Sequence, residues 1–288
     1  MARLRCTYRL QLGPGIGFRR ALALVPYLRD LGVSHLYLSP VMQARCGSTH
    51  GYDVVDPTRI SEELGGEEEF LALCGAVREH DLGVVLDVVP NHMAVGDENP
   101  FWRDPLWRAK FFDLDWRTGS HRRFFDVGEL AGVRVEDPEV WELTHRKVVE
   151  LARDGLIDGV RVDHPDGLAR PRRYLERLRE AGLERIWVEK ILECEEQLRA
   201  DWPVEGTTGY EFLNDVTALH VDPAGEEPMT RLYKEVCGEL RPFADVAAEA
   251  KLELSTAQPE VEEGEHNFTA RSEITVEGRS IVMLRRGW

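Results

Sequence analysis

Short apolar runs alternate with amphipathic helical stretches along the first part of the chain, and this alternation constrains the fold most. Strands are predicted at residues 7–12, 33–38 and 83–92, where apolar runs end in turn-forming or polar residues. Residues 18–31 and 67–80 between them repeat apolar side chains at helical spacing. Repeated alternation of strand and helix is typical of a parallel α/β sheet.

The run GVRV within residues 158–163 continues this pattern as a fourth strand. A continuous apolar run of this length is typical of a buried parallel strand. The predicted helix 137–154 precedes it, and the predicted helix 170–181 follows it. A fifth strand is predicted at residues 185–192. About five to six strand–helix units are therefore expected.

Between residues 93 and 145 the alternation stops, and an aromatic, charged segment follows. Long ordered insertions are usually functional, so this segment is predicted to be a lid or small subdomain over a site. Its aromatic residues either stack on a flat ligand such as a sugar or form the core of the segment itself, and the sequence leaves both readings open. They are Trp102, Trp107, Trp116, Phe124 and Phe125.

The remaining chain changes character. Residues 206–214 are predicted to form a loop and the start of a helix, and residues 226–251 a helix. Two antiparallel strands, 269–276 and 279–285, are predicted around Glu277-Gly278. The expected domains are a catalytic portion at residues 1–251, which includes the insertion at 93–145, and a short β-rich segment at 252–288.

The formal charge of −16 argues against nucleic acid and anionic membranes as partners, because both are polyanions. The five cysteines are odd in number and contain no Cys-x-x-Cys pair, which favours a reducing compartment. The N-terminus lacks the apolar region of a secretion signal, and no apolar run is long enough for a membrane helix. A cytoplasmic protein without a metal or other cofactor is expected. The oligomeric state stays open.

Polar side chains gather at the predicted strand ends. Two of them, Asp163 and Glu189, would lie on adjacent strands about 4.8 Å apart. Two carboxyl groups roughly 5–5.5 Å apart are the arrangement of a retaining glycosidase, with one as nucleophile and the other as acid/base. Arg161, two positions before Asp163 and on the same strand face, is expected to keep that carboxylate ionised. The strand ends also carry Asp87, Asn91, His92, His164 and Lys190.

Each residue also has a structural reading. Arg161 and Asp163 could form an ion pair without a catalytic role. Asp87 could bond only neighbouring backbone, and His92 could cap a helix from a loop. Glu189 beside Lys190 could be a surface pair. Their joint occurrence at the ends of successive strands favours a catalytic site.

These residues carry a resemblance to a known family. DVVPNH at 87–92, GVRVDHPDG at 159–167 and WVEKI at 187–191 resemble the first three signature regions of the α-amylase superfamily. More narrowly, several strings resemble the maltooligosyltrehalose synthase family. They are TYRLQL at 7–12, LVPYLRDLGVSHLYLSP at 24–40, GSTHGYDVVDPTRI at 47–60, RRFFDVGELAGVRVE at 122–136, VDHPDGL at 162–168 and WPVEGTTGYEFLN at 202–214.

The resemblance implies a (β/α)8 TIM-barrel type fold and an enzyme that acts on maltooligosaccharides. That family converts the reducing-end α-1,4 linkage into an α-1,1 linkage. The resemblance implies Asp163 as nucleophile, Glu189 as acid/base and Arg161 as the residue that orients the nucleophile. Tyr52 would stack on the sugar and His92 would bind a hydroxyl. Asp87, as support of the site, and then His164 and Lys190 complete the predicted binding residues.

Two features depart from the family pattern. No counterpart of the fourth signature region, which supplies a further aspartate, is found after Asn214, so barrel strands six to eight are not accounted for. Residues 252–288 resemble the C-terminal β-domain of a glycogen debranching enzyme instead. A non-catalytic remnant is therefore an alternative, and the general signatures also permit an α-glucan hydrolase, which the strings GTTGYEFLN and GSTHGYDVVDP disfavour.

Overall fold

The computed structural model describes residues 3–115, 117–125, 127–193, 196–238, 250–255, 267–268 and 282–286. The chain divides into two units, Met1–Asn214 and Asp215–Trp288. Every buried hydrophobic residue of the described chain lies in the first unit, the last of them being Trp202. The predicted boundary between residues 251 and 252 is not tested and stays a prediction.

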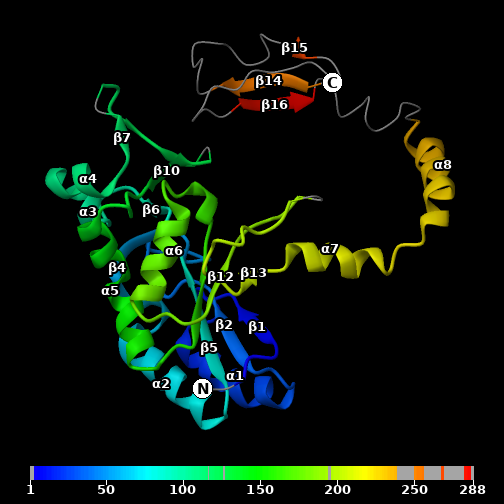
Figure 1. Cartoon of the computed structure of the whole chain (residues 1–288). Helices are drawn as coiled ribbons and strands as arrows, with labels where there is room; N and C mark the ends of the chain where they lie inside the picture. Colours follow the sequence, from blue (N-terminus) through cyan, green and yellow to red (C-terminus); the bar gives the residue numbers. More distant parts are fainter. Residues whose placement is uncertain are drawn as a thin grey trace. The chain divides into compact units, whose positions relative to one another are not determined.

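A six-stranded parallel sheet forms the centre of the first unit (Figure 1), and its strand order β1-β2-β5-β11-β12-β13 follows the order of the chain. The strands are β1 (Thr7–Leu10), β2 (His35–Leu38), β5 (Gly83–Val88), β11 (Gly159–Val162), β12 (Ile186–Val188) and β13 (Gly206–Thr207). The helices between them are α1 (Phe18–Asp30), α2 (Gly66–Glu79), α5 (Pro138–Arg153) and α6 (Pro171–Glu180). This is the sheet of an incomplete (β/α)8 barrel, as predicted.

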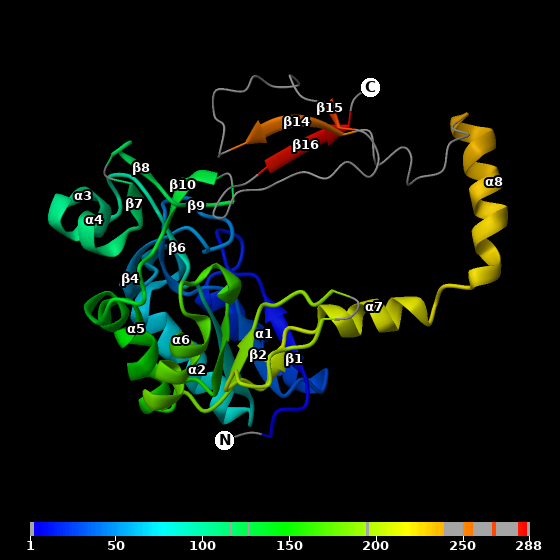
Figure 2. The same cartoon turned by 45° about the horizontal axis from the view of Figure 1, so that its top comes forward.

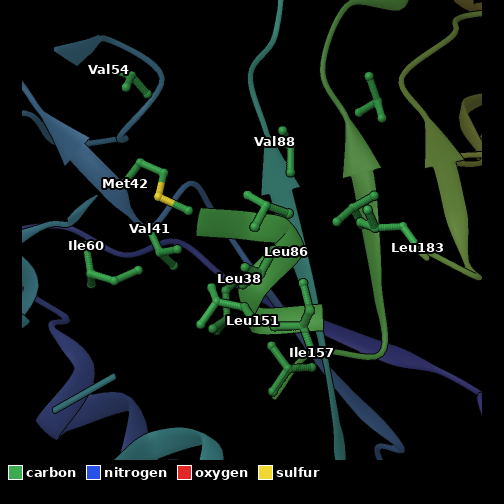
Figure 3. Packing of buried hydrophobic residues seen from close by; sticks show 14 of the residues in the cluster. Leu38, Val41, Met42, Val54, Ile60, Leu86, Val88, Leu151, Ile157 and Leu183 are labelled. Carbon is green, nitrogen blue, oxygen red and sulfur yellow. The ribbon is translucent and has the colours of Figure 1, made fainter. Parts of the chain in front are cut away.

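The two faces of the sheet have different surroundings because side chains alternate along a strand. Leu36, Leu86, Val160 and Ile186 belong to the hydrophobic core that the sheet shares with the helices. Figure 3 shows this packing for Leu38, Leu86 and Val88 together with Leu151, Ile157 and Leu183 from the following segments. The opposite face of the strands carries polar side chains such as Asp87. The strands that were predicted from apolar runs therefore also have a polar face.

Most predicted boundaries differ from the observed ones by a few residues, but the strand predicted at residues 83–92 is wrong in its second half. β5 ends at Val88, and His92 begins β6 (His92–Ala94) in another sheet. Pro90 lies at the break, where its missing N–H cannot contribute to strand pairing. β13, which pairs in parallel with β12, occupies two residues where a loop was predicted.

The insertion after β5 contains two small antiparallel sheets and two short helices (Figure 2). One sheet has the order β6-β10-β9, and the other pairs β7 with β8. Their bounds, with those of the remaining elements of the first unit, are β3 (Met42–Ala44), β4 (Val54–Ile60), η1 (Glu62–Leu64), α3 (Pro100–Arg103), α4 (Pro105–Phe111), β7 (Leu114–Asp115), β8 (Ser120–His121), β9 (Arg123–Phe124), β10 (Val127–Gly132) and η2 (Pro165–Gly167).

α7 (Tyr210–Ala218) crosses the division between the units. The second unit contains η3 (Pro223–Gly225), α8 (Glu226–Cys237) and a sheet of β15 (Asn267–Phe268), β14 (Ala250–Ser255) and β16 (Val282–Arg286). The helix predicted at 226–251 is wrong at its end, because Ala250 and Lys251 belong to a strand. The strand predicted at 269–276 lies outside the described residues, whereas β16 overlaps the one predicted at 279–285. No helix in the described ranges is long and apolar enough to cross a membrane.

Candidate active site

The polar strand face converges on one guanidinium. Nη1 of Arg161 lies 2.7 Å from Asp87 Oδ1 and 2.7 Å from Asp163 Oδ1, and its Nη2 lies 2.9 Å from Glu189 Oε1. Asp87 is the strand partner of Arg161 across β5 and β11. Glu189 follows β12, the strand on the other side of β11. One cation therefore binds carboxylates from three neighbouring strand ends.

Asp87 is fully buried, and its carboxylate accepts hydrogen bonds from four side chains. Oδ1 accepts from Arg161, whereas Oδ2 accepts from Arg9 at 3.1 Å, from the Tyr37 hydroxyl at 3.0 Å and from the Tyr52 hydroxyl. Asp87 is thus bonded by side chains and not by neighbouring backbone alone. Its place favours support of the site over direct contact with a ligand.

The carboxyl group of Asp163 has a raised pKa although Arg161 lies beside it. Burial of Asp163, together with the negative charges of Asp87 and Glu189, outweighs the attraction of Arg161 and raises the pKa of Asp163 to about 7. Arg161 thus favours the ionised form of Asp163, as expected, but burial and the neighbouring carboxylates favour the protonated form more strongly. Burial penalises the charged form of Asp163, and the carboxylates of Asp87 and Glu189 bind the same guanidinium.

Glu189 is held from its other oxygen by backbone. The N–H of His164 donates to Glu189 Oε2 at 3.1 Å. His164 has a φ of 43° and a ψ of 57°, the left-handed conformation that non-glycine residues seldom adopt. Such strain occurs mainly at functional sites. The Glu189 side chain is 26% exposed, so it is accessible to a ligand.

These side chains line a cleft of about 890 Å³. Of the predicted site residues it includes Asp163, Glu189, Arg161, Tyr52, His92 and His164. Lys190 does not line the cleft, and its ammonium lies 3.0 Å from Asp166 and 2.7 Å from Glu196. No group of three or more potential metal ligands occurs among the residues that the structure describes.

His92 lies under the aromatic side chain of Phe124, with ring centroids 3.9 Å apart and stacked. Only 1% of His92 is exposed, and burial lowers its pKa to about 4. Within the described chain, neither ring nitrogen makes a hydrogen bond of good geometry, although the backbone of Tyr52 lies close enough to favour the protonated ring. Both nitrogens are inaccessible to solvent while Phe124 covers the ring.

The aromatic residues of the insertion fall into two groups. Trp102 packs edge-on against Phe112, and Trp107 packs edge-on against Phe111, so these tryptophans belong to the core of the insertion. Phe124 and Phe125 line the cleft instead. Trp116 lies outside the described residues.

Arg9 and Tyr37 were not predicted as site residues. Both line the cleft, and the Arg9 guanidinium lies 4.7 Å from the centre of the Tyr37 ring and donates to the Tyr52 hydroxyl at 2.6 Å. The sequence did carry a signal for them. Each residue has a polar end and lies in a predicted strand beside leucines, so its side chain points away from the face that the leucines bury. Their strand face could be assigned only once the pairing of β1, β2 and β5 was known.

Comparison with known proteins identifies the family. The model of the α-amylase catalytic domain matches residues 22–204. The chain belongs to the α-amylase family. Within it, the chain is 36% identical to a putative maltooligosyl trehalose synthase of Mycobacterium tuberculosis, an alignment that covers 85% of this chain and 42% of that protein.

Solved structures agree with this family. The maltooligosyltrehalose synthase from Arthrobacter ramosus superposes with a TM-score of 0.77 at 36% identity, over 84% of this chain and 42% of that one. An α-amylase from Geobacillus thermoleovorans shares the fold at 19% identity, with a TM-score of 0.61 over 74% of this chain and 54% of that one. This chain spans about two-fifths of the length of the synthases it matches, 42% in both comparisons.

Proposed function

We propose that this chain is an intramolecular glucosyl transferase of the maltooligosyltrehalose synthase type. It would convert the reducing-end α-1,4 linkage of a maltooligosaccharide into an α-1,1 linkage. The main support is the pair Asp163 and Glu189, bridged by Arg161 in an open cleft. Because one guanidinium binds both carboxylates, the two acids lie on either side of the same cation, and a retaining mechanism needs two carboxyl groups that lie close together. The 36% identity to a putative synthase supports the narrower reaction.

In the first step Asp163, as the ionised carboxylate and with Glu189 protonated, attacks the anomeric carbon on the non-reducing side of the terminal linkage. The bond from that carbon to the linking oxygen breaks, and Glu189 donates its proton to the departing oxygen. This step forms a glycosyl ester on Asp163 and a free glucose. Arg161 stays charged, because its carboxylate neighbours and Tyr37 outweigh burial and raise its pKa, so it can orient both acids.

In the second step the freed glucose stays in the cleft and turns its anomeric hydroxyl toward the ester. Glu189 accepts the proton of that hydroxyl, the hydroxyl oxygen bonds to the anomeric carbon, and Asp163 leaves as a carboxylate. Two inversions give net retention. Water at this stage would produce glucose and a shortened chain, so the cleft must exclude it.

The proposed binding roles follow the geometry. Tyr52 would offer its ring to the sugar while its hydroxyl stays bonded to Asp87 and Arg9. His92 would bind a sugar hydroxyl once Phe124 shifts from its stacked position, and His164 would contribute the adjoining cleft wall. This chemistry needs no cofactor. We further propose a cytoplasmic location, because Cys6, Cys46 and Cys74 are free thiols.

Incubation of the purified protein with maltopentaose tests the proposal, with Asp163→Asn as the control. Loss of reducing ends without release of glucose, abolished in the control, is the expected result. Glucose release that depends on Asp163 would mean a hydrolase instead. An Asp163-independent result, or none at all, would contradict an enzymatic role for this chain.

A further inference from the structure

We propose that Arg122 is a positioning residue that holds the aromatic wall of the cleft, Phe124 and Phe125, over His92. The contact of its guanidinium with Asn91 and Asp113, called the Arg122 contact below, would thereby limit water access to the cleft. The positioning role stands on the geometry alone. Its consequence for water access deepens the proposed function and rests on it.

The backbone of Arg122 is fixed on both sides. Its N–H donates to the Asp113 carbonyl at 2.9 Å, and its carbonyl accepts from the Gly132 N–H at 2.7 Å. Arg122 therefore lies between β8 and β9, two residues before Phe124. A shift of this backbone would move the wall with it.

The side chain connects the wall to the catalytic strands. Nη1 donates to Asn91 Oδ1 at 3.1 Å, and Nε donates to Asp113 Oδ2 at 3.3 Å. Asn91 is 1% exposed and lies between β5, which carries Asp87, and β6. The ion pair with the 58% exposed Asp113 contributes little in water. The bond to the buried amide matters more, because its loss would leave that oxygen unpaired.

A glycine provides the space for the guanidinium. Gly132 lies directly opposite His92 in the pairing of β10 with β6. A Cβ at Gly132 would lie 2.4 Å from Cζ and 2.4 Å from Nη2 of Arg122, closer than atoms can approach. The guanidinium therefore fills the place where a side chain would stand beside the strand of His92.

The aromatic wall, Phe124 and Phe125, packs against two histidines, His92 and His164. The Phe124 ring stacks on His92 and lies 5.1 Å, edge-on, from the His164 ring, while Phe125 lies 5.5 Å from His164. Phe124 and Phe125 are also packed against each other at 4.6 Å. Release of the wall would expose His92, which is now 1% exposed.

Three variants disturb the Arg122 contact in different ways. Arg122→Lys keeps the charge but removes the planar fork that reaches Asn91 and Asp113 together. Asn91→Ala removes the acceptor, and Gly132→Ala fills the space of the guanidinium. Arg123→Lys, at an exposed neighbouring arginine, is the matched control. Urea unfolding identifies any variant that has lost the fold. The variants that remain folded are then used in the two measurements that test the Arg122 contact.

The first measurement is the rate at which diethyl pyrocarbonate modifies His92, followed by peptide mass spectrometry and normalised to the exposed His220. At least a threefold faster modification in the folded variants, with Arg123→Lys equal to the unaltered protein, is expected. Equal rates in all four variants would overturn the proposal. This readout needs no turnover, so it separates failure of the Arg122 contact from failure of the proposed function.

The second measurement is the ratio of released glucose to non-reducing product from maltopentaose. The ratio is expected to rise severalfold in the variants with faster His92 modification. An unchanged ratio in those variants would overturn the role in water exclusion. If the unaltered protein makes neither product, the proposed function and this consequence both fail, and the His92 rates still decide the positioning role.

Discussion

Asp87 shows how much of the site depends on one residue that is expected to touch no substrate. Its side chain has no solvent exposure and is bonded by two arginines and two tyrosines. Loss of one member of a buried ion pair leaves an uncompensated charge on the other. Here two guanidinium groups and the orientation of Tyr52 depend on the same carboxylate.

Asp87→Asn should therefore destabilise the protein strongly. An amide must point its NH2 group either at Arg161 or at Arg9 and the tyrosines, so donors would face donors. We expect the free energy of unfolding in urea to fall by about 3 kcal/mol. Asp30→Asn, at a surface pair with Arg29, is the control and should change it by less than about 1 kcal/mol. Equal effects of the two substitutions would refute the supporting role of Asp87.

The raised pKa of Asp163 predicts a stability that depends on pH. The folded protein keeps the proton of Asp163 up to about pH 7, whereas an unfolded aspartate releases it near pH 4. Between these values the unfolded state binds fewer protons, so this group lowers the stability as pH rises. Asp163→Asn removes that loss.

We compare the unfolding free energy of Asp163→Asn with that of the unaltered protein. The difference, variant minus unaltered protein, should increase by an amount on the order of 2 kcal/mol from pH 5 to pH 8. Urea unfolding at the two pH values measures it. A difference that does not change with pH would mean that Asp163 is ionised throughout this range, as expected if Arg161 were its only charged neighbour.

At the scale of elements, a buried hydrogen bond joins the helices α5 and α6. His145 Nε2 lies 2.7 Å from the Tyr174 hydroxyl, and both residues are buried. Burial lowers the pKa of His145 to about 4, so the imidazole is neutral at pH 7. The bond therefore pairs two polar groups that have no access to solvent.

Tyr174→Phe should cost about 1–3 kcal/mol of unfolding free energy, because it leaves the imidazole nitrogen unpaired. Tyr27→Phe, at a residue that is 63% exposed on α1, is the matched control and should be neutral. Thermal or urea unfolding at pH 7 compares them. A neutral Tyr174→Phe would show that the bond does not stabilise the packing of α5 on α6.

Helices and strands were predicted best where the repeat of apolar residues extends over many positions. The helix α5 has 16 residues and a clear pattern, and its prediction at 137–154 agrees with the observed Pro138–Arg153, whereas β13 has two residues and no period. The proximity of Asp163 and Glu189 was predicted from strand order. The ionisation of Asp163 was not, because the local sequence shows Arg161 but not the two other carboxylates that share it.

At the scale of the whole molecule, the described hydrophobic core ends at Trp202, before the second unit begins. The cleft residues also end before it, at Leu213. The first unit should therefore fold without most of the second.

A chain shortened to residues 1–221 should keep a cooperative urea transition with its midpoint unchanged within error, and it should keep the slow modification of His92. Loss of the transition would show that the second unit stabilises the first. A normal transition with fast modification of His92 would instead assign the second unit a role in covering the cleft.

The strand order of the sheet has a consequence for biosynthesis. Because β1-β2-β5-β11-β12-β13 is also the chain order, each new strand emerging from the ribosome finds its partner already made. Asp87 arrives first, and the next strand brings Arg161 and Asp163 together, before Glu189 is translated. The nascent site thus receives its central cation at the same time as its second carboxylate. At no stage of growth does the sheet bury two of these acids without the guanidinium that binds them.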